Sequence, residues 1–232
     1  MHKRIGILGG LSAESTAYYY TYITRTYTER YGDFSQPEII IYSVSLQKYL
    51  DWRNAGEWGE IAADMISAAK GLEKAGADFG IIATNTMHIV FEEVQAAVRI
   101  PFLHLVDTTV KVIQQRGFSS VGLLGTKFTM NEGFWKDRLA ANGITPIVPN
   151  LEDQESVNTV IEEELGRGQF KDNSRREFLD IIGKMANAGA EGVVLGCTEI
   201  PMLVQQQHCT LPLFDTSAIH AEAALQYAVA RK

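Results

Sequence analysis

Cysteine and long apolar runs are both scarce in this sequence. The 232 residues include two cysteines, Cys197 and Cys209, and neither lies in a CxxC or Cys/His spacing suited to zinc. No apolar run approaches the roughly 20 residues of a membrane span, and the N-terminal segment MHKRIGILGG reaches glycine too early to form a signal-peptide core. These absences exclude a disulfide framework and favour a cytoplasmic protein with no metal site and no contact with a membrane.

Positive charge is also limited. The net charge is −7 at pH 7, and no run of lysine or arginine could follow a phosphate backbone, so nucleic acid is not an expected partner. Two glycine-rich segments, GGLSAES and GTKFTMNEG, suggest nucleotide binding, but neither matches the dinucleotide fingerprint or the P-loop spacing. Nucleotide binding therefore falls to a minor alternative.

Short apolar runs alternate with segments of helical periodicity along the chain. The predicted strands are Ile5–Leu8, Ile39–Val44, Phe79–Ala83, Phe102–Val106, Val121–Leu124, Ile144–Val148, Gly192–Leu195 and Leu211–Phe214. The predicted helices are Ser15–Arg30, Glu57–Ala75, Asn131–Ala141, Ser174–Ala188 and Thr216–Ala230. This alternation predicts an α/β fold with parallel sheets.

The first half of the sequence is echoed in the second. RIGILGG is followed later by SVGLLGT, and IPFLHLVDTT by LPLFDTS. Between them, AGADFGIIATNT is echoed by AGAEGVVLGCTE, which pairs Thr84 with Cys197. One such match could arise by chance between buried strands, but three in the same order indicate a duplicated unit.

The duplication predicts two similar doubly wound α/β domains, each with a four-stranded parallel sheet, related by pseudo-two-fold symmetry. The expected first domain is residues 1–108 plus 212–232, and the second is residues 109–211. A (β/α)₈ barrel is the alternative, although a barrel needs no repeat at half length. Because ligands bind beyond the carboxyl ends of parallel strands, two facing domains would place Thr84 and Cys197 on opposite walls of one cleft.

Cys197 is the residue most suited to chemistry. It follows the buried run GVVLG and precedes TEI, where a strand gives way to a helix. A thiol there is expected to feel the helix dipole and free backbone N–H groups, which would lower its pKa and enrich the thiolate. The alternative is a cysteine that merely packs, which is how we interpret Cys209.

Polar residues at the other predicted strand ends could bind a small carboxylate. Hydroxyl and amide groups suit a carboxylate or a developing enediolate, although Ser, Thr and Asn are also ordinary helix caps. An arginine in the loop-like stretch YLDWRNAGEW could pair with a substrate carboxylate, and His88 and Glu199 could tune the two cleft residues. The candidate substrate-binding residues are Leu11, Ser12, Arg53, Asn85, Thr86, Thr126 and Thr198.

At these positions the sequence resembles the aspartate/glutamate racemase family. The matching segments run along the whole chain and are GGLSAEST, TNTMH, PFLHLVDTT, LLGTKFTM and GCTEI. The resemblance implies two similar α/β domains with the site between them, catalysis by two cysteines without pyridoxal phosphate or metal, and a homodimer. GCTEI resembles the aspartate-racemase form of the second motif rather than the GCTH form of glutamate racemases.

The sequence departs from the family pattern at two places. The first motif is commonly Cys-Asn-Thr in the family and here has threonine at Thr84, as in some members of the broader group. Many relatives carry a lysine that contacts the substrate's side-chain carboxylate, whereas this chain has Gly166 followed by Arg167. The charge for an acidic substrate would then come from Arg53 or Arg167.

The sequence therefore predicts a cofactor-independent racemase of aspartate, glutamate or both. Cys197 would act as thiolate base and Thr84 as opposing proton donor. Because a hydroxyl is a poor base, one direction should be preferred, and the family resemblance implies that the L enantiomer is the substrate for Cys197. The alternatives are a single-cysteine decarboxylase or isomerase of small dicarboxylates, and a non-catalytic protein that binds small carboxylates.

Overall fold

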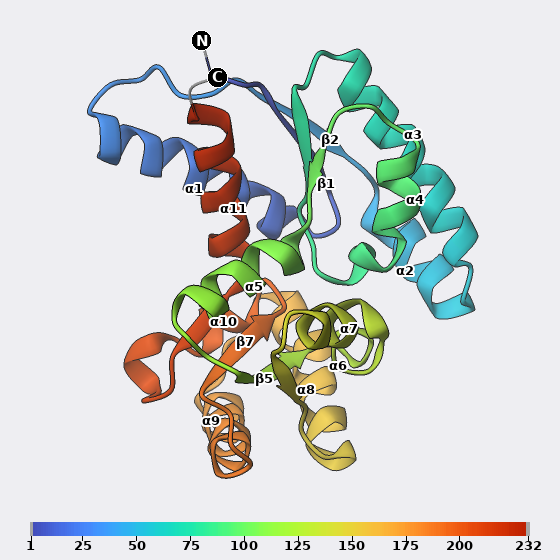
Figure 1. Ribbon diagram of the computed structural model, residues 1–232. Helices are drawn as coiled ribbons and strands as arrows, with labels where there is room; N and C mark the ends of the chain where they lie inside the picture. The colour runs from blue at the N-terminus through green and yellow to red at the C-terminus, as the bar shows by residue number, and fades with distance from the viewer. Residues whose placement is uncertain (1, 231–232) are drawn as a thin grey trace. The chain divides into compact units, whose positions relative to one another are not determined.

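The chain forms two compact units. The computed structural model describes residues 2–230, and unit 1 comprises Met1–Leu105 and Ser217–Lys232, while unit 2 comprises Val106–Thr216 (Figure 1). The sequence prediction assigned residues 212–232 to the first domain, but β8 (Leu213–Asp215) hydrogen-bonds to β7 (Gly192–Gly196) in unit 2. The chain thus completes the second sheet before it returns to unit 1. No helix within residues 2–230 is long and apolar enough to cross a membrane.

Unit 1 is built on a parallel sheet of strand order β2-β1-β3-β4. Strands β1 and β3 occupy the middle, with Ile7 opposite Ile41 on one side and Ile81 on the other. Its elements are β1 (Ile5–Gly9), α1 (Ala13–Tyr31), β2 (Ile39–Ser43), α2 (Leu46–Ala55), α3 (Trp58–Lys74), β3 (Phe79–Ile82), η1 (Thr86–Val90), α4 (Phe91–Ala96), β4 (Phe102–Leu103) and α11 (Thr216–Val229).

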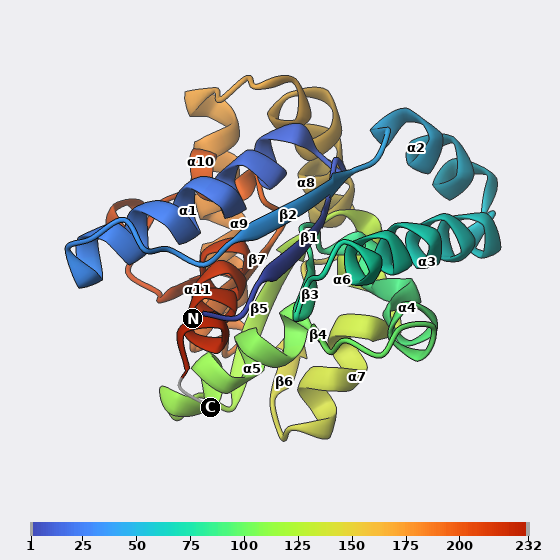
Figure 2. The same ribbon diagram turned by 90° about the horizontal axis from the view of Figure 1, so that it is seen from above.

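Helices cover both faces of the unit 1 sheet. Successive strand side chains point to opposite faces, so Ile5 and Ile7 pack with residues of α1 and α11. Leu8 packs on the other face, with residues of α3 and α4. Figure 2 shows α1 and α11 on one side of β1 and β3, with α3 and α4 on the other. The inner strands are buried on both faces, which explains their nearly continuous apolar sequence.

A half-buried carboxylate contact joins α2 to α3. The Tyr49 hydroxyl donates to Asp64 Oδ2 at 2.6 Å, and Lys48 Nζ lies 2.7 Å from Asp64 Oδ1. Partial burial alone would raise the pKa of Asp64, but the hydrogen bonds from Lys48 and Tyr49 outweigh it and lower that pKa. The α2–α3 hairpin is therefore held by a charge-assisted network as well as by apolar packing.

Unit 2 repeats this arrangement with the strand order β6-β5-β7-β8. Leu124 of β5 lies opposite Leu195 of β7, and helices α8 and α9 contribute Val157 and Phe178 to the core that contains both. The elements not yet given are α5 (Leu105–Gln115), β5 (Ser120–Gly125), α6 (Lys127–Asn131), α7 (Gly133–Ala141), β6 (Thr145–Ile147), α8 (Leu151–Glu163), η2 (Leu165–Arg167), α9 (Asp172–Asn187), α10 (Ile200–Leu203) and η3 (Gln206–His208).

The two strand orders correspond one to one, since β5, β6, β7 and β8 occupy the places of β1, β2, β3 and β4. The predicted fold class, two similar α/β units with four-stranded parallel sheets, is confirmed, and the barrel alternative is wrong. The equivalent positions pair β3 with β7, as the sequence echo between Thr84 and Cys197 predicts.

Candidate active site

The loop after β1 begins with two positions that only glycine can occupy. A Cβ atom on Gly9 would lie 2.5 Å from the Thr16 γ-methyl, and Gly10 has a φ of +81°, where a Cβ atom would lie only 2.2 Å from Val44 O. The Gly10 N–H donates to Thr16 Oγ1 at 2.8 Å. Ser12 then caps α1 by accepting from Ser15 N at 3.1 Å, and Leu11 is buried. Ser12, a predicted substrate-binding residue, is thus the N-cap of α1.

The loop after β3 carries Thr84, and its backbone is held on both sides. The Thr84 N–H donates to Ile82 O at 2.9 Å, and the Thr84 carbonyl lies 2.8 Å from His88 Nδ1. One residue earlier, the Ala83 carbonyl accepts from Ser15 Oγ at 2.8 Å, which ties this loop to α1. Thr84 is half-buried, whereas Asn85 and Thr86 are buried. Unit 1 therefore brings the two predicted loops together at one edge of its sheet.

The equivalent loops of unit 2 are linked by Thr129. Thr126 caps α6 by accepting from Thr129 N at 3.3 Å. Thr129 Oγ1 in turn lies 3.5 Å from Gly196 O, and its γ-methyl would meet a Cβ on either Gly125 or Gly196. The loop that carries Thr126 is thus packed directly against the strand end that carries Cys197.

Cys197 shares a carboxylate with its neighbour. The Cys197 thiol donates to Glu199 Oε2 at 3.0 Å, and the Thr198 hydroxyl donates to the same oxygen at 2.7 Å. Cys197 is buried, while Thr198 and Glu199 are half-buried. The second motif thus forms a compact group in which one carboxylate oxygen accepts both hydrogen bonds.

This geometry overturns the expectation that Cys197 is a thiolate at rest. Burial raises the pKa of the thiol well above its usual range, and the charge of Glu199 together with its hydrogen bond raises it further. Backbone N–H groups of Thr198 and Glu199 lower the pKa, as the sequence suggested, but they are the smaller effect. The helix that follows has only four residues, so its dipole is short.

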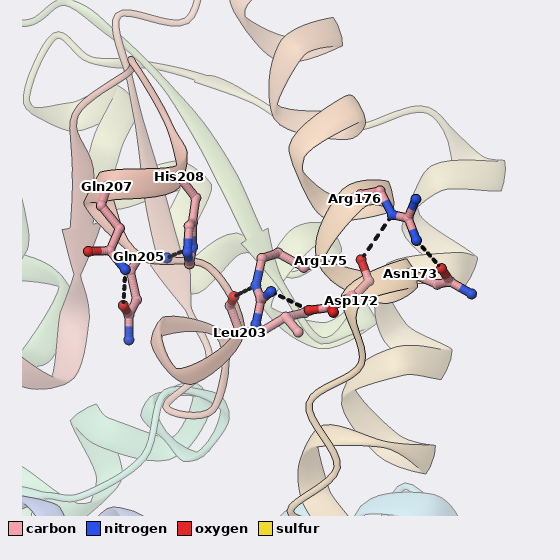
Figure 3. A network of polar contacts seen from close by, with 8 residues as sticks. All are labelled: Asp172, Asn173, Arg175, Arg176, Leu203, Gln205, Gln207 and His208. Atoms are coloured by element: carbon pink, nitrogen blue, oxygen red, sulfur yellow. Dashed lines mark hydrogen bonds and ion pairs between the residues drawn. The ribbon is translucent and has the colours of Figure 1, made fainter.

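An arginine from α9 anchors the end of the short helix that follows the second motif. Figure 3 shows Arg175 Nε donating to the Leu203 carbonyl, at 2.8 Å, while its Nη1 contacts Asp172 Oδ1. Arginine at a helix C-terminus satisfies a carbonyl that has no partner within the helix. The segment from Cys197 to Leu203 is therefore fixed at its far end by the first turn of α9.

The two candidate arginines belong to helical segments of different units. Arg53 is in the last turn of α2 rather than in a loop, and its Nε and Nη2 lie 3.3 and 3.2 Å from Asn54 Oδ1. Arg167 belongs to η2 and is exposed. Cys209 is half-buried and packs against the unit 2 core, in agreement with a structural role.

Three site features escaped the sequence interpretation. Thr16 and Thr129 pack on the glycines that end β1 and β5, and the recurrence of threonine after each glycine-rich loop is the signal that could have found them. The ring of His220 contacts the ring of His88, which belongs to the first motif, and nothing local in the sequence indicates this contact. Among residues 2–230, no three His, Cys, Asp or Glu side chains are grouped so that they could hold a metal ion.

The fold and these two motifs are those of an amino-acid racemase. Comparisons with known proteins identify the family. The family model for Asp/Glu/hydantoin racemase matches residues 8–224, so the chain belongs to that family and is an isomerase of the racemase type.

Three relatives illustrate the relationship. The broad specificity amino-acid racemase RacX of Bacillus subtilis is 26% identical over 95% of this chain and 96% of its own length. The crystal structure of a candidate Asp/Glu racemase from Yersinia pestis is 40% identical, with a TM-score of 0.93 over 98% of this chain and 100% of the other. An aspartate racemase homologue from Pyrococcus horikoshii is 37% identical, with a TM-score of 0.87 and the same coverage.

Proposed function

We propose that the protein racemises aspartate, glutamate or both without a cofactor, with Cys197 as base and Thr84 as the opposing proton donor. The observation that carries this proposal is the equivalence of the two residues. Each follows the inner strand of a sheet with the same strand order, β3 for Thr84 and β7 for Cys197. A racemase needs an acid and a base on opposite faces of one carbon, and a duplicated fold supplies two equivalent positions.

The first step in this mechanism is removal of the thiol proton. The Glu199 carboxylate, 3.0 Å from Cys197 Sγ, accepts that proton and becomes neutral, which leaves the thiolate beside an uncharged acid. The thiolate then takes the α-hydrogen of the L enantiomer, and the electron pair of the broken C–H bond moves into the substrate carboxyl group. Transfer to Glu199 removes the like charge that raises the thiol pKa.

The second step is protonation from the opposite face. The Thr84 hydroxyl donates its proton to Cα, which gives the D enantiomer, and regains a proton from water. Cys197 keeps the hydrogen taken from the substrate as its thiol hydrogen, and Glu199 releases its proton to solvent. A threonine alkoxide is seldom present near neutral pH, so at saturation the L enantiomer has the higher kcat. The ratio kcat/KM is the same in both directions, because the two enantiomers are equally stable.

The proposed substrate-binding groups are donors on the motif loops. Ser12, Asn85, Thr86, Thr126 and Thr198 offer hydroxyl or amide groups for a substrate carboxylate or the enediolate, and Leu11 offers an apolar surface. Arg53 is the proposed charge for the side-chain carboxylate of an acidic substrate. The broad specificity of RacX makes a wide substrate panel necessary.

The test is deuterium exchange at Cα in heavy water, with optical activity followed in parallel, over a panel of L- and D-amino acids. We expect exchange and inversion from L-aspartate or L-glutamate, with slower initial rates from saturating concentrations of the D enantiomers. Cys197→Ser should abolish both signals, and Cys209→Ser is the matched control that should retain them. Equal initial rates from saturating concentrations of the two enantiomers would contradict the assigned roles of Cys197 and Thr84.

One observation favours a second candidate. The paired positions hold a single cysteine, and a hydroxyl opposite one cysteine also suits a decarboxylase of disubstituted malonates, in which the thiol donates a proton and hydroxyls stabilise the enolate. Release of carbon dioxide from such a malonate, without Cα exchange on any amino acid, would establish that activity instead. Ligand binding with neither reaction would indicate a carboxylate-binding protein.

A further inference from the structure

A buried cluster of histidines lies within unit 1, close in the fold to Thr84. The chain has five histidines, and three of them, His88, His104 and His220, are each no more than 5% exposed. The ring centroids of His88 and His104 are 4.7 Å apart, and those of His88 and His220 are 6.0 Å apart. Three charged imidazoles at such spacings in a buried site would repel each other strongly, so the cluster is built for neutral rings.

The hydrogen bonds of His88 fix its tautomer. Nδ1 lies 2.8 Å from the Thr84 carbonyl, which can only accept, so Nδ1 carries the proton. Nε2 lies 3.3 Å from the Leu105 N–H, which can only donate, so Nε2 accepts. The ring also stacks on Phe91, with 5.6 Å between centroids and an interplanar angle of 7°. His88 is therefore a neutral ring with one defined orientation.

His220 supports the same arrangement from α11. Its Nε2 lies 2.9 Å from the Leu103 carbonyl and must carry the proton, which leaves Nδ1 to accept from the Tyr19 hydroxyl at 3.0 Å. Burial lowers the pKa of His220 to about 4, so this ring is uncharged at neutral pH. The two histidines together hold residues 103–105, where unit 1 ends, against the loop that carries Thr84.

We propose that His88 is a positioning residue, which acts by donating from Nδ1 to the Thr84 carbonyl and so fixes the direction of the Thr84 hydroxyl. This inference rests on the proposed function. The Thr84 N–H is held by Ile82 O and its carbonyl by His88, so both peptide groups that set the Cα–Cβ direction are fixed. Proton delivery to a carbanion needs that direction, because displacement of a catalytic group by about 1 Å can cost about 100-fold in rate.

Two neutral substitutions distinguish the role of Nδ1 from that of Nε2 in His88. His88→Asn places an amide donor near the position of Nδ1 and can keep the bond to the Thr84 carbonyl. His88→Gln places its amide near the position of Nε2 and loses that bond. Both variants remove one ring of the cluster. The structure nevertheless predicts that Thr84 still delivers its proton efficiently in the asparagine variant and does so poorly in the glutamine variant.

The readout is a ratio that does not depend on how much enzyme is folded. With L-aspartate or L-glutamate in heavy water, Cys197 can exchange the α-hydrogen and return deuterium to the same face, while inversion also needs Thr84. The measured ratio divides the amount of deuterium found at Cα of the recovered L substrate by the amount of D product formed. We expect this ratio to rise about 10-fold or more in His88→Gln and to stay within about threefold of wild type in His88→Asn.

A second measurement tests the tautomer without any substrate. Nitrogen-15 NMR of histidine-labelled protein should show a protonated Nδ1 and an unprotonated Nε2 for His88, and the opposite pattern for His220. The signal of His88 is assigned by its loss in His88→Asn. A protonated Nε2 on His88 would overturn the proposal whatever the activity of the protein.

The outcomes distinguish the inference from the function on which it rests. A wild-type protein that neither exchanges nor inverts any amino acid refutes the proposed racemisation and, with it, a role for His88 in that reaction. A wild-type protein that does both, with a ratio that His88→Gln leaves unchanged, refutes the role of His88 alone. A purely structural histidine would lower exchange and inversion by the same factor.

Discussion

Thr84→Cys tests the unequal pair most directly, because it gives unit 1 the thiol that unit 2 has at Cys197. In the D-to-L direction residue 84 must act as the base. With water as the reference, a hydroxyl has a pKa roughly seven units above that of free cysteine, which is about 8.5. At about 1.4 kcal/mol per unit, forming the hydroxyl anion costs about 10 kcal/mol more than forming the thiolate. The substitution removes that difference.

The structural cost of Thr84→Cys is small by comparison. The side chain is half-buried, so loss of its γ-methyl should cost less than about 1 kcal/mol. The contacts that hold the loop, from His88 and to Ile82, involve only the backbone of Thr84 and do not depend on its side chain. The chemical gain therefore exceeds the packing loss by a wide margin.

The assay compares initial rates, followed by optical rotation, from saturating concentrations of pure D- and L-aspartate and of pure D- and L-glutamate. We expect Thr84→Cys to convert the D enantiomer within about 10-fold of its rate on the L enantiomer. Thr84→Ser is the matched control, since it removes the methyl group and keeps the hydroxyl, and it should remain directional. A cysteine variant whose ratio of saturated rates on the D and L enantiomers is the same as in wild type would refute the assignment of Thr84 as the opposing group.

Three further predictions concern the site and the stability of unit 1. Glu199→Gln should lower the pKa of Cys197 by removing the adjacent charge, so that iodoacetamide, with mass-spectrometric detection, labels this thiol at lower pH than in wild type; unchanged labelling would contradict the contact. Gly10→Ala should lower the free energy of unfolding by about 2–5 kcal/mol in urea titrations, because it combines left-handed strain with a backbone clash, whereas Gly117→Ala, also at positive φ but in open space, should cost only about 1–2 kcal/mol. Asp64 has a lowered pKa, so its contribution is present above about pH 4 and is lost as the pH falls through the folded-state value; Asp64→Asn should therefore cost about 1–2 kcal/mol at pH 7 and flatten the stability profile below pH 4.

The architecture could be predicted because buried parallel strands leave a strong trace in sequence. Inner strands such as Ile5–Gly9 and Gly192–Gly196 are covered on both faces and consist almost wholly of apolar residues and glycine. Helices α2, α5 and α8 were not among the predicted helices, and the predicted strand Phe102–Val106 ends at Leu103, two residues before α5 begins at Leu105. The expected helix Asn131–Ala141 is in fact broken at Glu132, whose extended backbone separates α6 from α7.

The positions of the motif residues in the fold were predicted better than the protonation state of the Cys197 thiol. Strand ends located Thr84 and Cys197, because topology decides which loops follow the inner strands. The state of the thiol could not be obtained in the same way, since it depends on burial and on the direction of the Glu199 side chain. A carboxylate two residues after a cysteine points toward the thiol or away from it according to the turn, and the sequence alone does not determine that turn.

The difference between the two motifs matches the direction proposed for the reaction. The echo pairs Glu199 with Thr86 as well as Cys197 with Thr84, so unit 2 has a proton-accepting carboxylate where unit 1 has a hydroxyl. The thiol of Cys197 donates to that carboxylate, and loss of its proton is therefore provided for within unit 2. In unit 1 the carbonyl of Thr84 accepts a hydrogen bond from Nδ1 of the neutral His88. Because this nitrogen already carries a proton, it cannot accept one from the Thr84 hydroxyl. In the proposed mechanism, the carboxylate beside Cys197 favours removal of the α-hydrogen by this residue, and the fixed backbone of Thr84 favours delivery of a proton from its hydroxyl.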